Sequence, residues 1–269
     1  TAPTDPRRIP RRLDPSMTSE DFTPDIGDEP FSIPSRTQRA REFLVVREPS
    51  RLALQAGRLA RTPRGDGRPL LAIPGFGSTD ASMLPLRRYL AARSHDTQGW
   101  GLGRNDGDVE ALLERSLVVA AGLAEQARRP INLVGWSLGG VLARELARER
   151  PDIVHRVATY GTPLTGPRHT AAAQIYTDDQ LLGIDTMIAE REGRPIERPI
   201  LAIYSRNDGI VDWRTCIDNQ TPEVTHRQST STHLGMGSDP DVWRWTAEWF
   251  AESADRQAAT LAGVDCAPR

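Results

Sequence analysis

Residues 131–141 read I-N-L-V-G-W-S-L-G-G-V, and they decide how the rest of the chain is interpreted. The apolar run at 131–134 is typical of a buried strand. The run V-L-A-R-E-L-A-R-E-R that follows Gly140 has helical spacing of its apolar residues and stops at Pro151. These residues therefore predict a strand, a sharp turn and an amphipathic helix.

The turn carries the pattern G-x-S-x-G, formed by Gly135, Ser137 and Gly139. A serine at such a turn is held in a strained backbone conformation, and the strand and helix can approach only when the neighbouring side chains are almost absent. The serine hydroxyl then stands clear of the sheet, with a helix N-terminus behind it. We interpret the pattern in this context as a nucleophile elbow with Ser137 as the nucleophile.

The composition is that of an ordinary globular protein, since the 269 residues are 38% hydrophobic and carry a formal charge of −2. One domain of this length can bury a large core. The near-neutral charge gives no reason to expect nucleic acid or an anionic membrane surface as a partner. No apolar run approaches the roughly 18 residues of a membrane span. We therefore expect no integral membrane segment, and the oligomeric state is left open.

The two cysteines, Cys216 and Cys266, are too few for a disulfide framework. The sequence leaves open whether they form one bridge or stay as two free thiols. No signal-peptide pattern is visible, which favours a cytoplasmic protein, but the chain begins at Thr1 and a removed leader stays an alternative.

The first 35 residues contain seven prolines among arginines and aspartates, and they lack the periodicity of a helix or a strand. Residues 1–35 therefore predict an extended arm. Residues 36–269 are expected to form a single domain. The first apolar residues of that domain, at 37–60, predict a helix that is interrupted near Pro49.

Short apolar segments alternate with amphipathic stretches over the remainder of the chain. This alternation favours a parallel sheet covered on both faces by helices, because parallel strands need long crossover connections. Helical pieces at 165–195 interrupt the rhythm and predict a small cap over the strand ends, where open α/β sheets bind ligands. The predicted strands are 70–73, 95–100, 131–134, 153–160, 199–204 and 224–228.

Two loops downstream offer the partners that a serine nucleophile needs. The hydroxyl requires a base to take its proton, and a carboxylate holds a histidine base in the correct tautomer. Asp208 follows the strand at 199–204 and His233 follows the strand at 224–228, so both lie at strand ends, as Ser137 does. We predict that Ser137, Asp208 and His233, in this order, form a catalytic triad.

Other ionisable residues compete for these roles. Asp212 lies four residues beyond Asp208 and is the alternative acid, although its position favours the start of the next helix. His226 falls within a predicted strand, where a half-buried structural histidine is more common. No H-x-x-H or H-E-x-x-H spacing occurs, so no metal site is predicted. A surface position is the default interpretation for the other histidines, His95, His155 and His169.

The loop after the first predicted strand, P-G-F-G-S at 74–78, fits half of an oxyanion hole with the Phe76 N–H as donor. The sequence does not complete a phosphate-binding loop there, because no G-K-[ST] or G-x-G-x-x-G follows. The Leu138 N–H, directly after the serine, is the expected second donor. The candidate substrate-binding residues, which core packing explains almost as well, are Gly75, Trp136, Tyr160, Leu164 and Met236.

The ordered motifs P-G-F-G, G-W-S-L-G-G, S-R-N-D-G-I-V and H-L-G-M resemble those of the α/β-hydrolase superfamily, specifically its esterase and lipase members. The resemblance covers residues 70–251. It implies a mostly parallel sheet of eight strands with helices on both faces. The first two strands of that pattern are not found before Leu70, so the antiparallel edge is missing or replaced by helix.

The residues and the resemblance together imply a serine hydrolase that cleaves small-molecule carboxylic esters through an acyl-enzyme, with no cofactor. Two alternatives stay open. The same triad serves acyltransferases and thioesterases, which differ in acceptor or leaving group. A hydrolase-fold protein without activity would serve binding alone, and the intact set of predicted catalytic residues argues against it.

Overall fold

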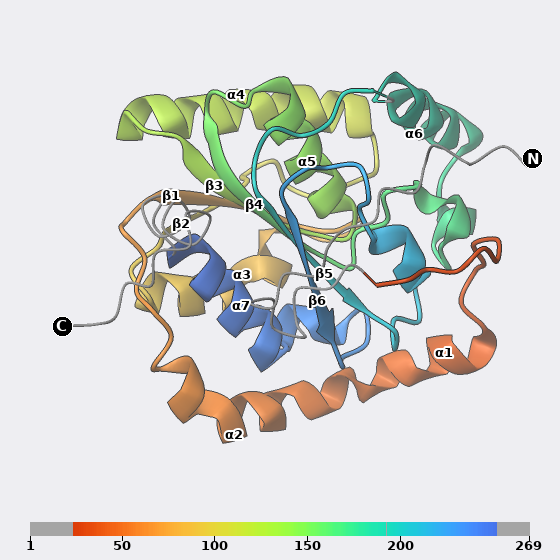
Figure 1. Cartoon of the computed structure of the whole chain (residues 1–269), viewed down its shortest axis with the longest axis horizontal. Helices are drawn as coiled ribbons and strands as arrows, with labels where there is room; N and C mark the ends of the chain where they lie inside the picture. The colour runs from red at the N-terminus through yellow and green to blue at the C-terminus, as the bar shows by residue number, and fades with distance from the viewer. Residues whose placement is uncertain (1–23, 192, 252–269) are drawn as a thin grey trace, which may run out of the picture.

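The computed structural model describes residues 24–191 and 193–251 (Figure 1). The first 23 residues of the predicted arm and Cys266 lie outside the described residues. Cys216 is described, and it is a buried free thiol. No helix within the described ranges is long and apolar enough to cross a bilayer.

A single parallel sheet of six strands forms the centre of the described chain, in the order β2-β1-β3-β4-β5-β6. The predicted architecture of a parallel sheet with helices on both faces is confirmed. The strands are β1 (Pro69–Ile73), β2 (Asp96–Gly99), β3 (Ile131–Trp136), β4 (Val154–Tyr160), β5 (Ile200–Ser205) and β6 (Val224–Ser229).

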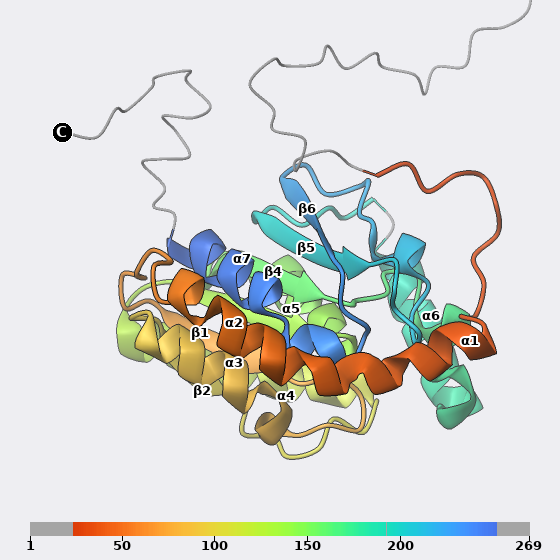
Figure 2. The same ribbon diagram turned by 90° about the horizontal axis from the view of Figure 1, so that it is seen from below.

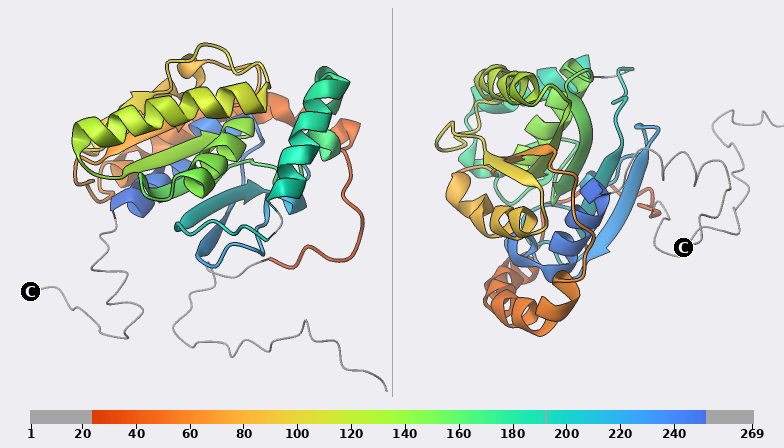
Figure 3. Two further views of the ribbon diagram at one scale, coloured as in Figure 1. Left: turned by 90° about the horizontal axis from the view of Figure 1, so that it is seen from above. Right: turned by 90° about the vertical axis from the view of Figure 1, so that its left-hand side faces the viewer.

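Helices cover both faces of this sheet (Figures 1 and 3). The side chains of β1 illustrate how one strand packs against both helical layers. Leu71 and Ile73 join the apolar core beneath α4 (Val109–Ala127) and α5 (Leu138–Glu149). Leu70 and Ala72 join the core beneath α3 (Asp80–Ala92) and α7 (Pro240–Ala251). Because successive side chains of a strand point to opposite faces, a strand buried on both faces is apolar throughout.

Residues 36–59 are helical, and the described chain before β1 contains neither of the two strands that the family resemblance implied. It forms α1 (Arg36–Ala40), the 3₁₀ segment η1 (Arg41–Arg47) and α2 (Glu48–Leu59). The predicted interruption near Pro49 corresponds to the boundary between η1 and α2, and Pro49 lies in the first turn of α2, where its missing N–H costs nothing. The irregular part is η1. We call residues 36–59 the N-terminal helical segment. It lies outside α7, along the end of the molecule where β5 and β6 finish (Figure 2).

The connection between β4 and β5 contains the predicted helical pieces. They are η2 (Pro167–His169), η3 (Ala173–Ile175) and α6 (Asp178–Glu190). Thr177 begins α6 with a capping box, in which its hydroxyl accepts from the Gln180 N–H and the Gln180 side chain accepts from the Thr177 N–H. α6 packs beside α4 and projects beyond the sheet (Figure 3).

Candidate active site

Ser137 lies between the last residue of β3 and the first residue of α5, with φ 53° and ψ −122°. This backbone conformation is strained for any residue with a side chain. The three glycines of the turn make it possible. A Cβ atom on Gly135 would collide with the Gly139 carbonyl, one on Gly139 with the Ile73 carbonyl, and one on Gly140 with the Thr162 side chain. Because these positions carry no side chain, the backbones of β3 and α5 can lie in direct contact.

Asp208 and His233 meet beyond the ends of β5 and β6. The imidazole Nδ1 of His233 lies 2.7 Å from Oδ2 of Asp208, and both side chains are buried. The other carboxylate oxygen of Asp208 accepts from the N–H groups of Ile210, at 2.8 Å, and Val211, at 2.7 Å. With Oδ1 held in this way, Oδ2 accepts the Nδ1 proton, and Nε2 is left free to act as a base.

The imidazole of His233 lies next to the turn that carries Ser137. The Ser137 N–H donates to the Tyr160 carbonyl at 2.9 Å, and the next residue, Gly161, contacts the His233 ring. A Cβ on Gly161 would stand 2.9 Å from Nδ1 of His233. The hydrogen bonds of the described residues do not include one from the Ser137 hydroxyl to the imidazole. Such bonds are often formed only when substrate is present.

Two opposing effects set the pKa of His233. Burial lowers the pKa, since it disfavours the imidazolium, but the adjacent Asp208 carboxylate outweighs it and the pKa is raised above 6.5. The carboxylate of Glu42 acts in the same direction. The site therefore stabilises the positive charge that this imidazole acquires when it takes a proton.

Asp212, the alternative acid, binds other groups and not His233. Its carboxylate pairs with the Arg214 guanidinium at 2.6 Å and accepts the Ser32 N–H at 3.0 Å. Burial raises the pKa of Asp212, but the hydrogen bonds from Arg214 and from backbone N–H groups lower it by more. The net pKa of Asp212 is therefore below its usual value. The structure therefore joins Asp208, and not Asp212, to the histidine.

The remaining histidines lie away from this pair. His226 accepts the Asp218 N–H at 3.0 Å, and burial is the main cause that lowers its pKa to about 4. His95 is buried rather than at the surface, edge-on to Phe250. His169 packs edge-on to Phe31. Within residues 24–191 and 193–251, no group of three or more His, Cys, Asp or Glu residues has the arrangement of a metal site.

The P-G-F-G loop lies directly against the serine turn. A Cβ on Gly75 would stand 3.3 Å from the Cβ of Ser137. In the described part of the chain, the Phe76 N–H has no acceptor. Leu138 is the first residue of α5, where a backbone N–H has no acceptor within the helix. Both predicted oxyanion donors are thus free to bind a ligand oxygen.

Asn105 shapes this loop, and it was not among the site residues predicted from the sequence. Its fully buried side-chain amide donates to the Pro74 carbonyl at 2.8 Å. Its backbone carbonyl accepts the Gly77 N–H at 2.7 Å, and its own N–H donates to the Ser78 carbonyl. The turn-rich stretch G-L-G-R-N-D-G contains this asparagine but gives no indication of its partners.

A small apolar cavity that opens to solvent is lined by Ser137. It runs between α5 and α6, and Leu164 lines it as expected. Gly75, Trp136, Tyr160 and Met236 are not among its lining residues. Tyr160 and Met236 are buried in the core, and the Trp136 ring packs between Tyr160 and His233. The apolar wall includes Phe76, Leu138, Val141, Leu164, Ile184 and Ile188.

Comparison of the sequence with known proteins gives a short match. No protein-family model matches the chain. A pimeloyl-[acyl-carrier protein] methyl ester esterase of Aeromonas hydrophila is 35% identical over 100 residues. This match spans 35% of the present chain and 38% of that protein's length.

Comparison of the structure gives broader similarity at lower identity. A structure from work on the metagenome-derived lipolytic enzymes LipS and LipT has a TM-score of 0.55 at 17% identity, over 75% of this chain and 96% of that one. Aspergillus fumigatus lipase B has a TM-score of 0.58 at 15% identity, over 90% of this chain and 64% of its own. Paleococcus ferrophilus monoacylglycerol lipase has a TM-score of 0.52 at 15% identity, over 71% of this chain and 96% of its own.

These similarities agree with the parallel sheet and with the helices on both of its faces. The chain has the α/β-hydrolase fold.

Proposed function

We propose that this protein is a serine hydrolase of carboxylic esters, with Ser137 as nucleophile, His233 as general base and Asp208 as the acid that orients the base. The observation that carries the proposal is the Asp208–His233 hydrogen bond beside the strained Ser137 turn. Similarity to proteins named as esterases and lipases supports the same reaction class.

The reaction follows from these positions. Oγ of Ser137 attacks the ester carbonyl while Nε2 of His233 removes the hydroxyl proton. The carbonyl oxygen becomes an oxyanion, which the N–H groups of Phe76 and Leu138 stabilise. Collapse of this intermediate breaks the ester C–O bond, and the imidazolium gives its proton to the departing alcohol. Water, deprotonated by His233, then attacks the acyl-enzyme and releases the acid and Ser137.

The apolar cavity supports an aliphatic or aromatic acyl group as the part of the substrate next to Ser137. Its wall is made largely of apolar side chains from α5, the segment after β4 and α6. We assign residues 165–195 as the cap over this cavity. The same triad would also serve a thioester substrate or a non-water acceptor, and a competing alcohol or thiol in the assay distinguishes these reactions by their products.

Hydrolysis of p-nitrophenyl esters of graded acyl length tests the proposal, with Ser137→Ala in parallel. We expect serine-dependent release with a length optimum set by the cavity. If no ester is cleaved, labelling of the native chain but not Ser137→Ala by a fluorophosphonate would indicate a reactive serine with another acceptor. Absence of both hydrolysis and labelling would contradict the proposal.

A further inference from the structure

Glu42 is a buried carboxylate in the N-terminal helical segment, outside the sheet and its crossover helices. It accepts three backbone hydrogen bonds from two distant loops. Its Oε1 accepts from Gly209 at 2.7 Å and from His233 at 3.0 Å, and its Oε2 accepts from Leu234 at 2.9 Å. A carboxylate has lone pairs for about four such bonds, so a single side chain can satisfy all three donors.

These donors lie at the candidate site itself. Gly209 directly follows Asp208, and the His233 donor is the backbone N–H of the histidine that bonds to Asp208. We call the loop after β5, which carries Asp208, the acid loop, and the loop after β6, which carries His233, the histidine loop. Glu42 thus fixes the backbones of these two loops relative to each other. Charge-assisted bonds from N–H groups to a buried carboxylate are stronger than bonds between neutral groups.

The acid loop is shaped to receive this segment. A Cβ on Gly209 would collide with the Gln38 carbonyl and would stand 2.9 Å from Oε1 of Glu42. The glycine therefore allows the backbones of α1 and of the acid loop to touch. No such approach could occur with a larger residue at position 209.

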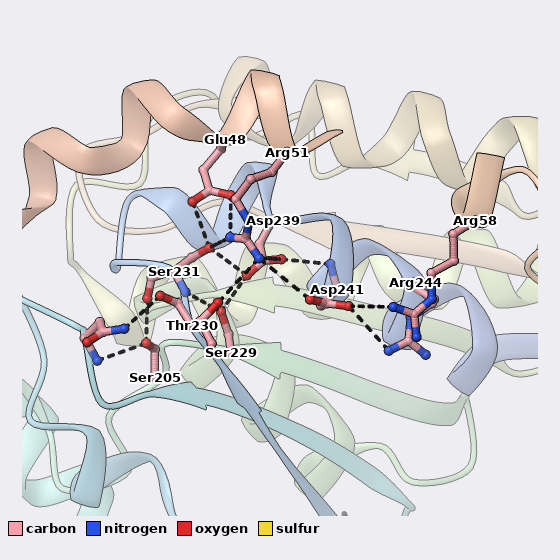
Figure 4. A network of polar contacts seen from close by, with 11 residues as sticks. Glu48, Arg51, Arg58, Ser205, Ser229, Thr230, Ser231, Asp239, Asp241 and Arg244 are labelled. Carbon is pink, nitrogen blue, oxygen red and sulfur yellow. Dashed lines mark hydrogen bonds and ion pairs between the residues drawn. The ribbon is translucent and has the colours of Figure 1, made fainter. Parts of the chain in front are cut away.

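A second set of hydrogen bonds, a few residues away, joins the same two loops to each other and to α2 (Figure 4). Glu48 lies 2.9 Å from the Ser231 hydroxyl, and Arg51 donates to that hydroxyl at 2.6 Å. The Ser205 hydroxyl, at the end of β5, donates to the Ser231 carbonyl at 2.5 Å. The Asn207 side chain donates to the Thr230 carbonyl at 2.8 Å. The two loops are bonded to each other and, through Ser231, to α2.

We propose that Glu42 is a positioning residue for the Asp208–His233 pair, acting both by holding the two loops in register and by adding a negative charge that faces the imidazole. This inference rests on the proposed function for its kinetic test. Its structural test, the titration of His233, does not depend on any catalytic activity.

The charge environment of His233 makes the electrostatic part testable. Asp208 from the loop after β5 and Glu42 from η1 are the charged groups that act on its pKa. The other side chains packed against the ring, Trp136 and Met236, carry no charge, and neighbouring Tyr160 stays neutral because burial raises its pKa well above the usual value. Removal of the Glu42 charge is therefore expected to lower the pKa of His233.

Glu42→Gln is the informative substitution, because it keeps the size and one acceptor oxygen but removes the charge. The reaction needs neutral His233, so the acid limb of the kcat/KM profile follows the pKa of this residue. We expect the limb to move to lower pH by on the order of 0.5–1 unit. We expect kcat to fall about 10-fold or more as the loops lose register, with KM nearly unchanged.

Asp218→Asn is the matched control. Asp218 is also a buried carboxylate, paired with Arg144, but it does not act on His233. We expect this variant to lose stability without any shift of the acid limb. A Glu42→Gln variant that behaves like Asp218→Asn, less stable but with kcat and the acid limb unchanged, would overturn the proposal.

Histidine NMR separates this inference from the proposed function. The His233 signal is assigned by its loss in His233→Gln, and its titration is compared between the native chain and Glu42→Gln. A lower pKa in Glu42→Gln supports the inference even if no ester is cleaved, whereas an unchanged pKa overturns it. Absence of serine-dependent hydrolysis in the native chain contradicts only the proposed function.

Discussion

The carboxyl group of Glu48 lies 2.9 Å from the hydroxyl oxygen of Ser231. That hydroxyl also lies 2.6 Å from Oδ2 of Asp239 and accepts a bond from Arg51 (Figure 4). A hydroxyl has one proton and can donate to only one carboxylate. Because Asp239 also accepts from Ser229 at 2.6 Å, Glu48 is the better candidate to carry a proton of its own and donate it to Ser231.

Glu48→Gln is expected to stabilise the fold at neutral pH. Burial raises the pKa of Glu48 and outweighs the opposing effects of the Ser231 hydrogen bond and of Arg51, so folding favours the protonated form more than the unfolded chain does. As the pH rises from about 4.5 through the raised pKa, the native chain loses stability because it must ionise this buried group. Glutamine imitates the neutral acid, since its oxygen accepts from Arg51 and its NH₂ donates to Ser231.

Thermal melts at two pH values check this prediction. The Tm of Glu48→Gln should exceed that of the native chain at pH 7.5, and the difference should vanish at pH 4, where both carry a neutral side chain. A lower Tm at pH 7.5 would contradict this prediction, because it would show that the native carboxyl group of Glu48 stabilises the fold more than a neutral amide does.

Substitution of the two aspartates separates their roles. Asp208→Asn is expected to reduce kcat by about 10³–10⁴-fold, because the amide disfavours the tautomer in which Nε2 is the base. Asp212→Asn is expected to keep kcat within about 3-fold and to lower Tm, because Asp212 pairs with Arg214 and receives the Ser32 N–H. Steady-state kinetics with a p-nitrophenyl ester and circular dichroism measure both effects. An inactive, folded Asp212→Asn beside an active Asp208→Asn would reverse the assignment.

Gly140→Ala is expected to destabilise the protein by roughly 2–4 kcal/mol through overpacking at the serine turn. The three atoms nearest to the new methyl group would belong to the Thr162 side chain. Gly140→Ala combined with Thr162→Ala should therefore recover part of the lost stability in urea denaturation. Gly139→Ala serves as the contrast, because its methyl group would meet the backbone carbonyls of Ile73 and Pro74, which no side-chain truncation can relieve.

Ile188→Trp is expected to narrow the apolar cavity and to shift the acyl preference toward shorter chains. Ile188 lines the cavity from α6. Relative kcat/KM for a long acyl ester should fall about 10-fold or more, while that for an acetyl ester stays within about 2-fold. Leu182→Trp is the control on the same helix, because Leu182 is exposed and does not line this cavity. An equal loss for both chain lengths would argue that the acyl group binds elsewhere.

The features that could be predicted from the sequence are those with a local pattern. The strand and helix around Ser137 and the alternation of strands and helices are encoded in runs of neighbouring residues. Asp208 and His233 could be proposed because each follows a recognisable strand, and parallel strands place their carboxyl ends together. The pairing itself is shown only by the structure.

The features that escaped prediction depend on contacts between distant segments. Glu42 stands in a helical pattern like any surface glutamate, and its burial follows from Gly209 and two loops far along the chain. The cavity wall was predicted mostly from strand-end and loop residues such as Trp136 and Tyr160, whereas much of it comes from the segment after β4 and from α6. Between residue 24 and β1 the described chain has no strand, and the sequence indicated this because no alternating apolar run occurs there.

The bond between Glu42 and the His233 backbone joins residues 191 positions apart. Contacts of such long sequence separation are among the last to become favourable during folding. A chain still emerging from the ribosome would have its serine turn long before its histidine loop could meet Glu42. Under the proposed function, the Asp208–His233 pair therefore reaches its final register only after residue 234 has been synthesised.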